Sequence, residues 1–393
     1  MPRRRASDRS RPDLLSLLAA KEMVLVVGSG GVGKTTASAA MAAAAATQIG
    51  GRVLVLTVDP AKRLADALGV GEIRNEATRV PDQVFLDAGL EPYGELWAAM
   101  LDTRQGWDEL IHQHAPDAEI RDAVLANPLY QNLTGRFVHS HDYLAMEKLH
   151  ELHATGEWDL IVVDTPPSRN ALAVLDAPRQ MKEFFGSRLL RWLTVPYRSR
   201  LFTVASKPFY QIADRVLGSR FLQDIAEFFI LFQAMERGFV DHATEVERLL
   251  VDQRTTFVVV STLEAAPSHE ATFLARELLR RDMHLGAIIA NRVLPSSFMT
   301  KAAATSARKL VKAAPDGLAA DVAAELDVDP LATEAVLTEI GERFHDLAVV
   351  ATREAERRAE LEVLTPLLVA APMLQHDIND VADLLELAER FDG

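Results

Sequence analysis

A glycine-rich stretch near the N-terminus carries the first residues whose types and spacing could do chemistry. Residues 28–36 are GSGGVGKTT and satisfy the pattern G-x-x-x-x-G-K-[ST]. Glycines let backbone N–H groups close around phosphate oxygens, the lysine adds a point charge to the β- and γ-phosphates, and the next hydroxyl can bind Mg²⁺. The pattern predicts a loop that binds a nucleoside triphosphate, here ATP with Mg²⁺. The residues expected to line it are Gly28, Ser29, Gly30, Gly31, Val32, Gly33, Lys34, Thr35 and Thr36.

Two carboxylates follow apolar runs further along the chain. Asp59 comes after RVLVLTV and before Pro60, so it could cap a helix, and it could also orient or deprotonate the water that attacks a γ-phosphate. Both roles can hold together. Asp164 closes LIVV, where a carboxylate typically holds magnesium through a bound water. Pro166 and Pro167 then fix an extended turn suited to sensing the γ-phosphate.

An amide side chain also follows an apolar run, near the C-terminal third of the chain. Asn291 ends LGAIIAN. It could be a turn residue, or its amide could read the donor and acceptor of the adenine edge.

These side chains need strands to position them, and five short apolar runs predict buried parallel strands at residues 23–27, 52–58, 159–164, 256–261 and 285–291. The alanine-rich stretch between the first two predicts a helix packed closely on the sheet, which completes a βαβ unit. Most of the remaining chain has a helical pattern, in blocks at 95–113, 142–154, 176–252 and 300–360.

The expected fold is therefore α/β: a P-loop NTPase with a mostly parallel sheet flanked by helices and an inserted helical subdomain. Residues 1–21 are expected to form a basic tail and a short helix. The ATPase domain is assigned to 22–92, 153–176 and 253–393, and the helical insertion to 93–152 and 177–252.

Composition narrows the function classes. The 393 residues have a formal net charge of -14, which argues against nucleic-acid binding. The absence of cysteine excludes disulfides, thiolate metal sites and cysteine nucleophiles. The apolar run LLSLLAA near the N-terminus is too short for a convincing signal peptide, and no run of about eighteen apolar residues occurs, so we expect a cytoplasmic protein without a transmembrane helix.

The motifs together resemble the ArsA-type ATPases, which include the arsenite-pump ATPase and the guided-entry targeting ATPase for tail-anchored proteins. GSGGVGKTT, DPAKRLADAL, DTPPSRNAL and NRV occur in the family's order, and DYLAMEKL and DTPPSRNAL are most similar to its actinobacterial anion-transporting branch. The resemblance covers residues from about 22 to 391. It implies a dimer that closes on two nucleotides, switch segments at Asp59 and Asp164, and an adenine-side loop near Pro372 and Met373.

Ser29 departs from this resemblance. The family usually carries a lysine there, which reaches across the dimer to the other subunit's nucleotide, whereas a serine supplies no charge. Three explanations remain open. The chain pairs with a paralogous subunit that keeps the lysine, another cation such as Lys62, Arg63 or Arg169 substitutes, or the chain binds ATP with little turnover. We favour the heterodimer, since Lys34, Thr35, Asp59 and Asp164 are all present.

The cargo is open. Thiolate binding of arsenite and a zinc-binding cysteine pair are excluded, and we expect solvated or helix-packed histidines rather than a metal site from His112, His114, His139, His141, His150 and His153. Residues 181–240 carry nine Lys or Arg against five Asp or Glu and place Phe221, Leu222, Ile225, Phe228, Phe229, Phe232 and Met235 on one helical face. That face is interpreted as core or subunit interface, or alternatively as a groove for an apolar helix or a membrane-binding surface.

Three alternative functions stay open beside the ATP-hydrolysing subunit. One is a nucleotide-bound regulatory or scaffold subunit with little turnover. A second is a partitioning or positioning ATPase of the MinD kind, which the acidic C-terminal helix disfavours. The third is a small-molecule kinase, which the ordered switch motifs disfavour.

Overall fold

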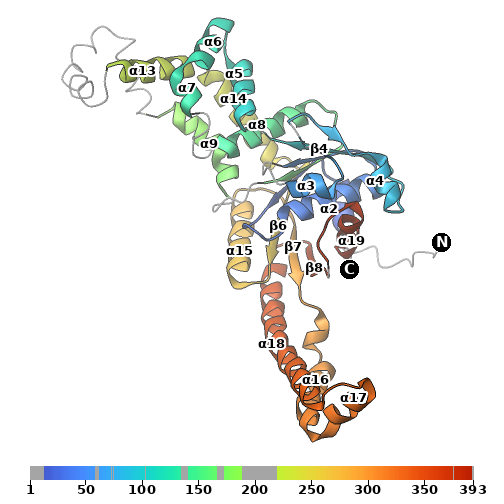
Figure 1. The fold of residues 1–393 in the computed structure, drawn as a ribbon. Helices are drawn as coiled ribbons and strands as arrows, with labels where there is room; N and C mark the ends of the chain where they lie inside the picture. The colour runs from blue at the N-terminus through green and yellow to red at the C-terminus, as the bar shows by residue number, and fades with distance from the viewer. Residues whose placement is uncertain are drawn as a thin grey trace.

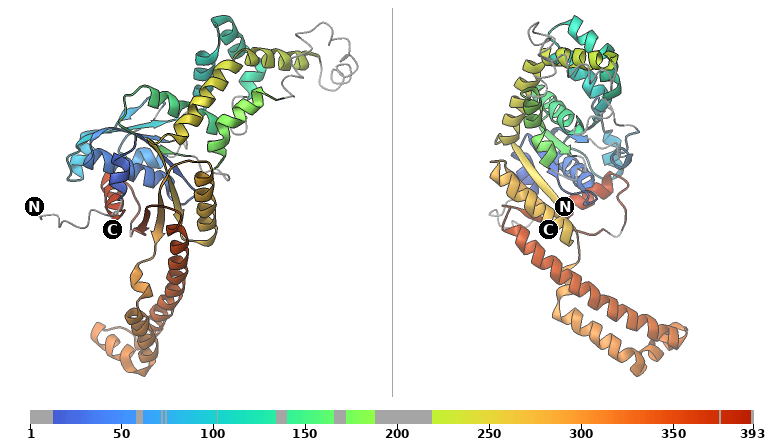
Figure 2. Two further views of the ribbon diagram at one scale, coloured as in Figure 1. Left: turned by 180° about the vertical axis from the view of Figure 1, so that it is seen from behind. Right: turned by 90° about the vertical axis from the view of Figure 1, so that its left-hand side faces the viewer.

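The computed structural model describes residues 13–57, 62–71, 73, 75–101, 103–133, 140–165, 172–187, 219–374 and 376–391. Figures 1 and 2 show an elongated molecule in three parts. A central sheet carries helices on both faces, a group of helices extends from one end of it, and a long helical arm projects from the other.

The central sheet has eight strands in the order β3-β4-β2-β5-β1-β6-β7-β8. All neighbouring strands run parallel except β3 and β4. The prediction of a mostly parallel sheet flanked by helices is confirmed. The strands are β1 (Met23–Val27), β2 (Gly51–Thr57), β3 (Thr78–Arg79), β4 (Gly94–Met100), β5 (Leu160–Asp164), β6 (Thr255–Thr262), β7 (Leu285–Val293) and β8 (Leu368–Pro372).

The inner strands are apolar throughout because helices cover both faces of the sheet. Every residue of β1, β5 and β6 is buried. Alternate residues of β1 enter two separate cores, Leu25 on one face and Val24 on the other. The face that contains Val24 is covered by α1 (Leu14–Ala19), α2 (Lys34–Gln48), α3 (Lys62–Ala67), α4 (Asp82–Asp87) and α19 (Val381–Arg390).

The helix that follows β1 is built almost entirely from small residues. In α2 the run from Ala39 to Ala46 is buried, and alanine is both the best helix former and small enough to let a helix lie close to the sheet. The alanine-rich stretch is therefore the predicted helix of the βαβ unit.

The predicted helical block at 95–113 is wrong in its first six residues, while most of the rest forms α5 (Thr103–His114). Residues 95–100, ELWAAM, form most of β4, which pairs in parallel with β2 from Gly51↔Gly94 to Thr57↔Met100. Leu96, Ala98 and Ala99 are buried there. Leucine, alanine and methionine favour a helix locally, and the pairing with β2 overrides that preference. The division into domains stays a proposal, in which the first helical insertion would now begin after β4.

The helical group at one end covers the other face of the sheet together with α15 (Ala265–Arg280). It contains α5 (Thr103–His114), α6 (Ala118–Ala126), α7 (Pro128–Leu133), α8 (Ser140–Ala154), α9 (Leu172–Phe185), α13 (Ser219–Ala234) and α14 (Glu236–Val251). Phe185 stacks on Phe232 with ring centroids 5.3 Å apart, and Phe228 and Met235 are also buried. The described residues of the apolar face predicted in 181–240 therefore belong to the core, which was one of the two interpretations of that face. The side chains of Phe221, Leu222 and Ile225 lie outside the described residues, as do residues 188–218.

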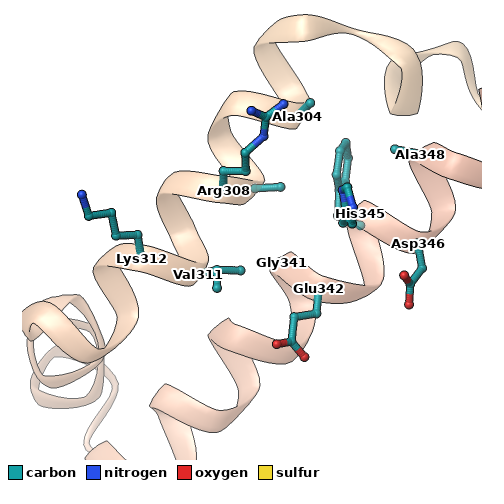
Figure 3. Close-up of a pocket in the computed structure, with 11 residues that line it drawn as sticks. Ala304, Arg308, Val311, Lys312, Gly341, Glu342, His345, Asp346 and Ala348 are labelled. Carbon is teal, nitrogen blue, oxygen red and sulfur yellow. The ribbon is translucent and has the colours of Figure 1, made fainter.

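The arm is a helical hairpin that leaves the sheet after β7. It contains η1 (Ser296–Met299), α16 (Lys301–Ala313), the turn η2 (Ala314–Leu318), α17 (Ala319–Leu326) and α18 (Pro330–Glu362). The two long helices touch where Gly341 meets Val311, since a Cβ on Gly341 would lie 2.3 Å from the Val311 methyl Cγ2. A groove of about 590 Å³ lies between them (Figure 3). No described helix is long and apolar enough to cross a membrane.

Candidate functional site

The glycine-rich loop lies at the centre of the sheet, between the end of β1 and the start of α2. Strand β1 has β5 on one side and β6 on the other. Gly28 passes so close to β6 that a Cβ there would lie 2.2 Å from the backbone oxygen of Val260. Gly33 adopts φ +95° at the N-cap of α2. These positions require glycine. The loop backbone therefore stays close to the N-terminus of α2, where N–H groups and the helix dipole favour an anion.

Lys34 is the first residue of α2, and only 6% of it is exposed. Its Nζ donates hydrogen bonds to the carbonyl oxygens of Gly28 at 3.0 Å and Ser29 at 2.9 Å. The ammonium group therefore lies across the mouth of its own loop. Since phosphate oxygens are the charged competitors for these donors, we expect Lys34 to exchange the two carbonyls for phosphate when a nucleotide binds.

Asp164 lies beside the loop because β5 pairs with β1 as far as Val26↔Asp164. Its Oδ2 accepts a 2.6 Å hydrogen bond from Thr35 Oγ1 and a 3.0 Å hydrogen bond from Thr57 Oγ1. The two side chains expected from the sequence to hold magnesium are thus in direct contact. Their hydroxyl and carboxylate oxygens are hard ligands of the kind that Mg²⁺ prefers.

Thr57 and Thr165 belong to this arrangement, and the sequence reasoning missed both. Thr57 ends β2 opposite Asp164 in the register and comes two residues before Asp59. Thr165 Oγ1 donates a 2.7 Å hydrogen bond to the carbonyl of Val26, which ties the end of β5 to the entrance of the loop. The only available signal was a hydroxyl residue at the end of an apolar run.

Asn291 reaches the loop from β7. Its Nδ2 donates to the carbonyl of Val32 at 2.8 Å, and its Oδ1 accepts from the backbone N–H of Arg292 at 2.9 Å. A Cβ on Gly33 would lie 2.3 Å from the same Nδ2, so the amide also packs against the loop. Asn291 therefore supports the loop directly, and its contact with adenine stays a prediction.

Pro372 and Met373 lie one strand beyond Asn291. Pro372 ends β8 and pairs with Val293, whose carbonyl accepts a 3.3 Å hydrogen bond from the Met373 N–H. The Met373 side chain is 65% exposed. The pair is thus at the same edge of the sheet as Asn291 and is available to a ligand, and its contact with adenine stays a prediction.

Ser29 contributes its backbone to the site rather than a charge. Its carbonyl accepts from Lys34, while its Oγ is buried without a hydrogen-bond partner among the described residues. Of the other loop residues, Gly30 and Gly31 are exposed and Val32 is buried.

Several predicted residues lie outside the described part of the chain. They are Asp59, Pro166, Pro167 and Arg169, together with the side chains of Lys62 and Arg63. The strand ends that precede two of them are described, since Thr57 comes shortly before Asp59 and Thr165 directly before Pro166. The hydrogen bonds of Thr57 and Thr165 therefore anchor the starts of both predicted switch segments.

The groove in the arm is separate from this site. Its lining comes from α16 and α18, including Arg308, Val311 and Glu342 (Figure 3), and no loop residue contributes to it. The chemistry suited to triphosphate therefore stays with the loop and its neighbouring strand ends.

Comparisons with known proteins found a matching family and several relatives. A family model described as an anion-transporting ATPase matches residues 21–314, three quarters of the chain, and ends where α16 meets the turn of the arm. All of α17, α18, β8 and α19 lie beyond it.

Individual relatives have modest identity over long alignments. An uncharacterized protein of Streptomyces coelicolor is 29% identical over 276 residues, which are 69% of this chain and 62% of that protein. ATPase GET3 of Malassezia globosa is 27% identical over 292 residues, or 73% and 78% of the two chains. A putative arsenical pump-driving ATPase of Aquifex aeolicus is 25% identical over 279 residues, or 69% and 79%.

Proposed function

This chain belongs to the anion-transporting ATPase (ArsA) family, and on that premise we propose that it is an ATP-hydrolysing subunit acting as a dimer. Nucleotide-driven closure of the dimer would move the helical group that extends from the sheet. The observation that carries the proposal is the contact between Thr35 and Asp164 beside the glycine-rich loop.

The residues present fit Mg·ATP. Thr35 and Asp164 would hold magnesium, the latter through water, and the metal would neutralise charge on the β- and γ-phosphates. Lys34 would transfer its hydrogen bonds from loop carbonyls to phosphate oxygens. Asp59 would orient the attacking water and accept its proton. Asn291, Pro372 and Met373 would bound the adenine.

The serine at position 29 supports a heterodimer. A cation delivered from a second subunit to a phosphoryl-transfer site can be worth about 10³–10⁵ in rate. The Ser29 hydroxyl is buried and carries no charge, so a homodimer would lack that contribution from this position at both sites. We propose that a paralogous subunit with lysine at the equivalent position completes the site in this chain.

The test is single-turnover ATP hydrolysis by the isolated chain, by its Ser29→Lys variant and by the chain with a co-purifying paralogue. The proposal expects slow hydrolysis alone and a rise of at least about 100-fold with either the lysine or the partner. Asp59→Asn should abolish all three activities. Fast hydrolysis by the isolated wild-type chain would remove the reason for a heterodimer.

The alternative functions give different results in the same experiment. A regulatory or scaffold subunit would bind ATP yet stay slow under every condition, including with Ser29→Lys. A kinase would release ADP only with an acceptor. A positioning ATPase of the MinD kind would sediment with anionic vesicles in an ATP-dependent manner, although its usual basic membrane helix is replaced here by α19, which is acidic.

A client helix or membrane surface at residues 181–240 stays part of the proposal in a narrower form. The described aromatic side chains there, such as Phe228 and Phe232, are buried in the helical group. The side chains of Phe221, Leu222 and Ile225 and residues 188–218 lie outside the described part of the chain. Co-purification tests whether a client binds this segment.

A further inference from the structure

Three helices far apart in the sequence bring a second group of chemically active side chains together. His114 is the last residue of α5, Glu147 lies in the middle of α8, and His242 lies in the first half of α14. Figure 1 shows these helices side by side in the helical group. The cluster is part of the helical group and shares no residue with the nucleotide loop.

The geometry of the cluster suits a small cation. One nitrogen of each histidine and one carboxylate oxygen of Glu147 all lie within 4.8 Å of one another. The rings of His114 and His242 are 4.5 Å apart between centroids, and His242 Nδ1 lies 3.2 Å from Glu147 Oε2. Ligand atoms around a tetrahedral zinc ion at 2.0–2.1 Å stand about 3.4 Å apart, so small rotations of the side chains would suffice.

An unsatisfied nitrogen points to a ligand. His114 is 8% exposed, and its Nε2 is buried with no hydrogen-bond partner among the described residues. Burial lowers the pKa of His114 to about 4. Buried polar atoms normally have partners, so an unpartnered nitrogen beside a carboxylate requires an explanation.

The buried carboxylate of Glu147 lies beside that nitrogen. Glu147 is 4% exposed, accepts a hydrogen bond from the Tyr143 hydroxyl, and has an ion-pair partner only in His242 among the described residues. A buried carboxylate is costly unless a cation or several donors compensate it. Packing on Phe239, at 4.5 Å between ring centroids, accounts for the apolar side of His114 and leaves its Nε2 unexplained.

We propose that His114, Glu147 and His242 bind one divalent transition-metal ion of the zinc class. Two imidazoles and a carboxylate form a borderline nitrogen and oxygen donor set, which suits Zn²⁺ or Co²⁺ and not Mg²⁺ or Ca²⁺. His150 and Glu245 form a second group that shares His242, so they stand next to the site as a source of a further ligand. The bound ion would join α5, α8 and α14, which come from both predicted helical insertions, into one unit.

The test uses the full chain, stripped with a chelator and free of nucleotide. Titration with Co²⁺ should give the d–d absorption of a low-symmetry site, which saturates at one equivalent. Zn²⁺ should displace the bound Co²⁺ and raise the midpoint temperature of thermal unfolding. His114→Gln and Glu147→Gln should each weaken Zn²⁺ binding by more than the roughly 10–100-fold that loss of a supporting residue costs. His242→Gln changes a less buried position, and it replaces either of these variants in the binding experiment if that variant fails to fold.

Matched controls separate this site from the nucleotide loop and from surface histidines. His112→Gln changes an exposed histidine two residues before His114 on the same helix, and it should leave Zn²⁺ binding unchanged. Asp164→Asn should also leave it unchanged while impairing the magnesium site. Absence of a Co²⁺ spectrum in the wild-type chain, or equal Zn²⁺ affinity in wild type and the three cluster variants, would overturn the proposal without bearing on ATP hydrolysis.

Discussion

Thr35 and Asp164 are 129 positions apart in the sequence, and the Thr35 hydroxyl donates a 2.6 Å hydrogen bond to the Asp164 carboxylate. The contact exists because β5 is the direct parallel neighbour of β1, so that the end of one strand faces the loop that leaves the other. A hydroxyl from the loop and a carboxylate from the adjacent strand are hard oxygen ligands of the kind that Mg²⁺ prefers. The pair therefore gives the first prediction.

Asp164→Asn removes the carboxylate and keeps the shape of the side chain. We expect ATP hydrolysis in the completed dimer to fall by roughly 10²–10³-fold, the size typical for losing one preorganised charged group. Binding of ATP measured without magnesium should stay within about threefold of wild type, since Lys34 and the loop amides remain. Hydrolysis that depends on magnesium as in wild type would contradict the assignment.

Thr57→Val tests the second donor to the same carboxylate. The Thr57 hydroxyl is 3.0 Å from Asp164 Oδ2, and valine has nearly the same shape. Since a hydrogen bond to a charged group contributes about 1.5–3 kcal/mol and Thr35 remains, we expect up to about a tenfold rise in the magnesium concentration needed for half-maximal hydrolysis. Thr47→Val is the matched control, because the Thr47 hydroxyl donates within α2, to the carbonyls of Ala43 and Ala44. An unchanged magnesium dependence in Thr57→Val would show that Thr57 does not position Asp164.

Local patterns predicted the loop and most of the sheet, and they failed where the decisive contacts are long-range. The loop glycines, Lys34 and Asp164 were found because each stands at a fixed offset from an apolar run. Strand β4 was missed because its residues favour a helix until they pair with β2. The sequence contains no pattern that distinguishes β8 from a loop. It also contains none that distinguishes the projecting arm from helices packed on the sheet.

The candidate side chains show the same division. Thr57 has no sequence signature, since a hydroxyl at a strand end is common, and only the register opposite Asp164 gives it a role. His114 and His150 were noted in the sequence, but no spacing connects them to His242, which comes from a helix about a hundred residues later. Helix packing, rather than local periodicity, brings these groups together.

Asn291→Ala distinguishes two roles of one amide. If Asn291 reads adenine, the variant should lose its preference for ATP over GTP. In the wild type guanine would leave the Asn291 amide unpaired, and the variant has no amide to leave unpaired. If it only supports the loop through its 2.8 Å bond to Val32, affinity for both nucleotides should fall equally, by about tenfold. Competition binding with the two nucleotides measures the difference. Wild-type affinity for both would contradict either role.

Gly28→Ala and Gly31→Ala separate a steric requirement from a conformational one. A Cβ on Gly28 would lie 2.2 Å from the backbone oxygen of Val260, whereas a Cβ on Gly31 meets nothing within 4 Å although its φ is +80°. We expect Gly31→Ala to cost about 1 kcal/mol in stability, as a strained backbone alone does. Gly28→Ala should cost clearly more, because β6 would have to shift. Urea unfolding of both variants tests this order, and equal midpoints would contradict it.

Shortening the arm tests whether it is independent of the nucleotide site. Val311 and Gly341 are in contact, so residues 312–340 can be replaced by a short glycine-rich turn that joins them. The root of the arm would remain, including the 2.7 Å hydrogen bond from Arg357 Nη1 to the carbonyl of Leu263.

We expect the shortened chain to fold and to bind ATP within about twofold of wild type, because the main contacts of α16, η2 and α17 are with other elements of the arm, and the family match ends at residue 314. The tip also carries exposed apolar side chains such as Leu331, which is 77% exposed, so its removal should improve solubility of the isolated chain. Calorimetric titration with ATP and light scattering measure the two effects. Loss of ATP binding in a folded shortened chain would show that the arm acts on the loop through α18 and β7, and the arm would then belong to the ATPase cycle.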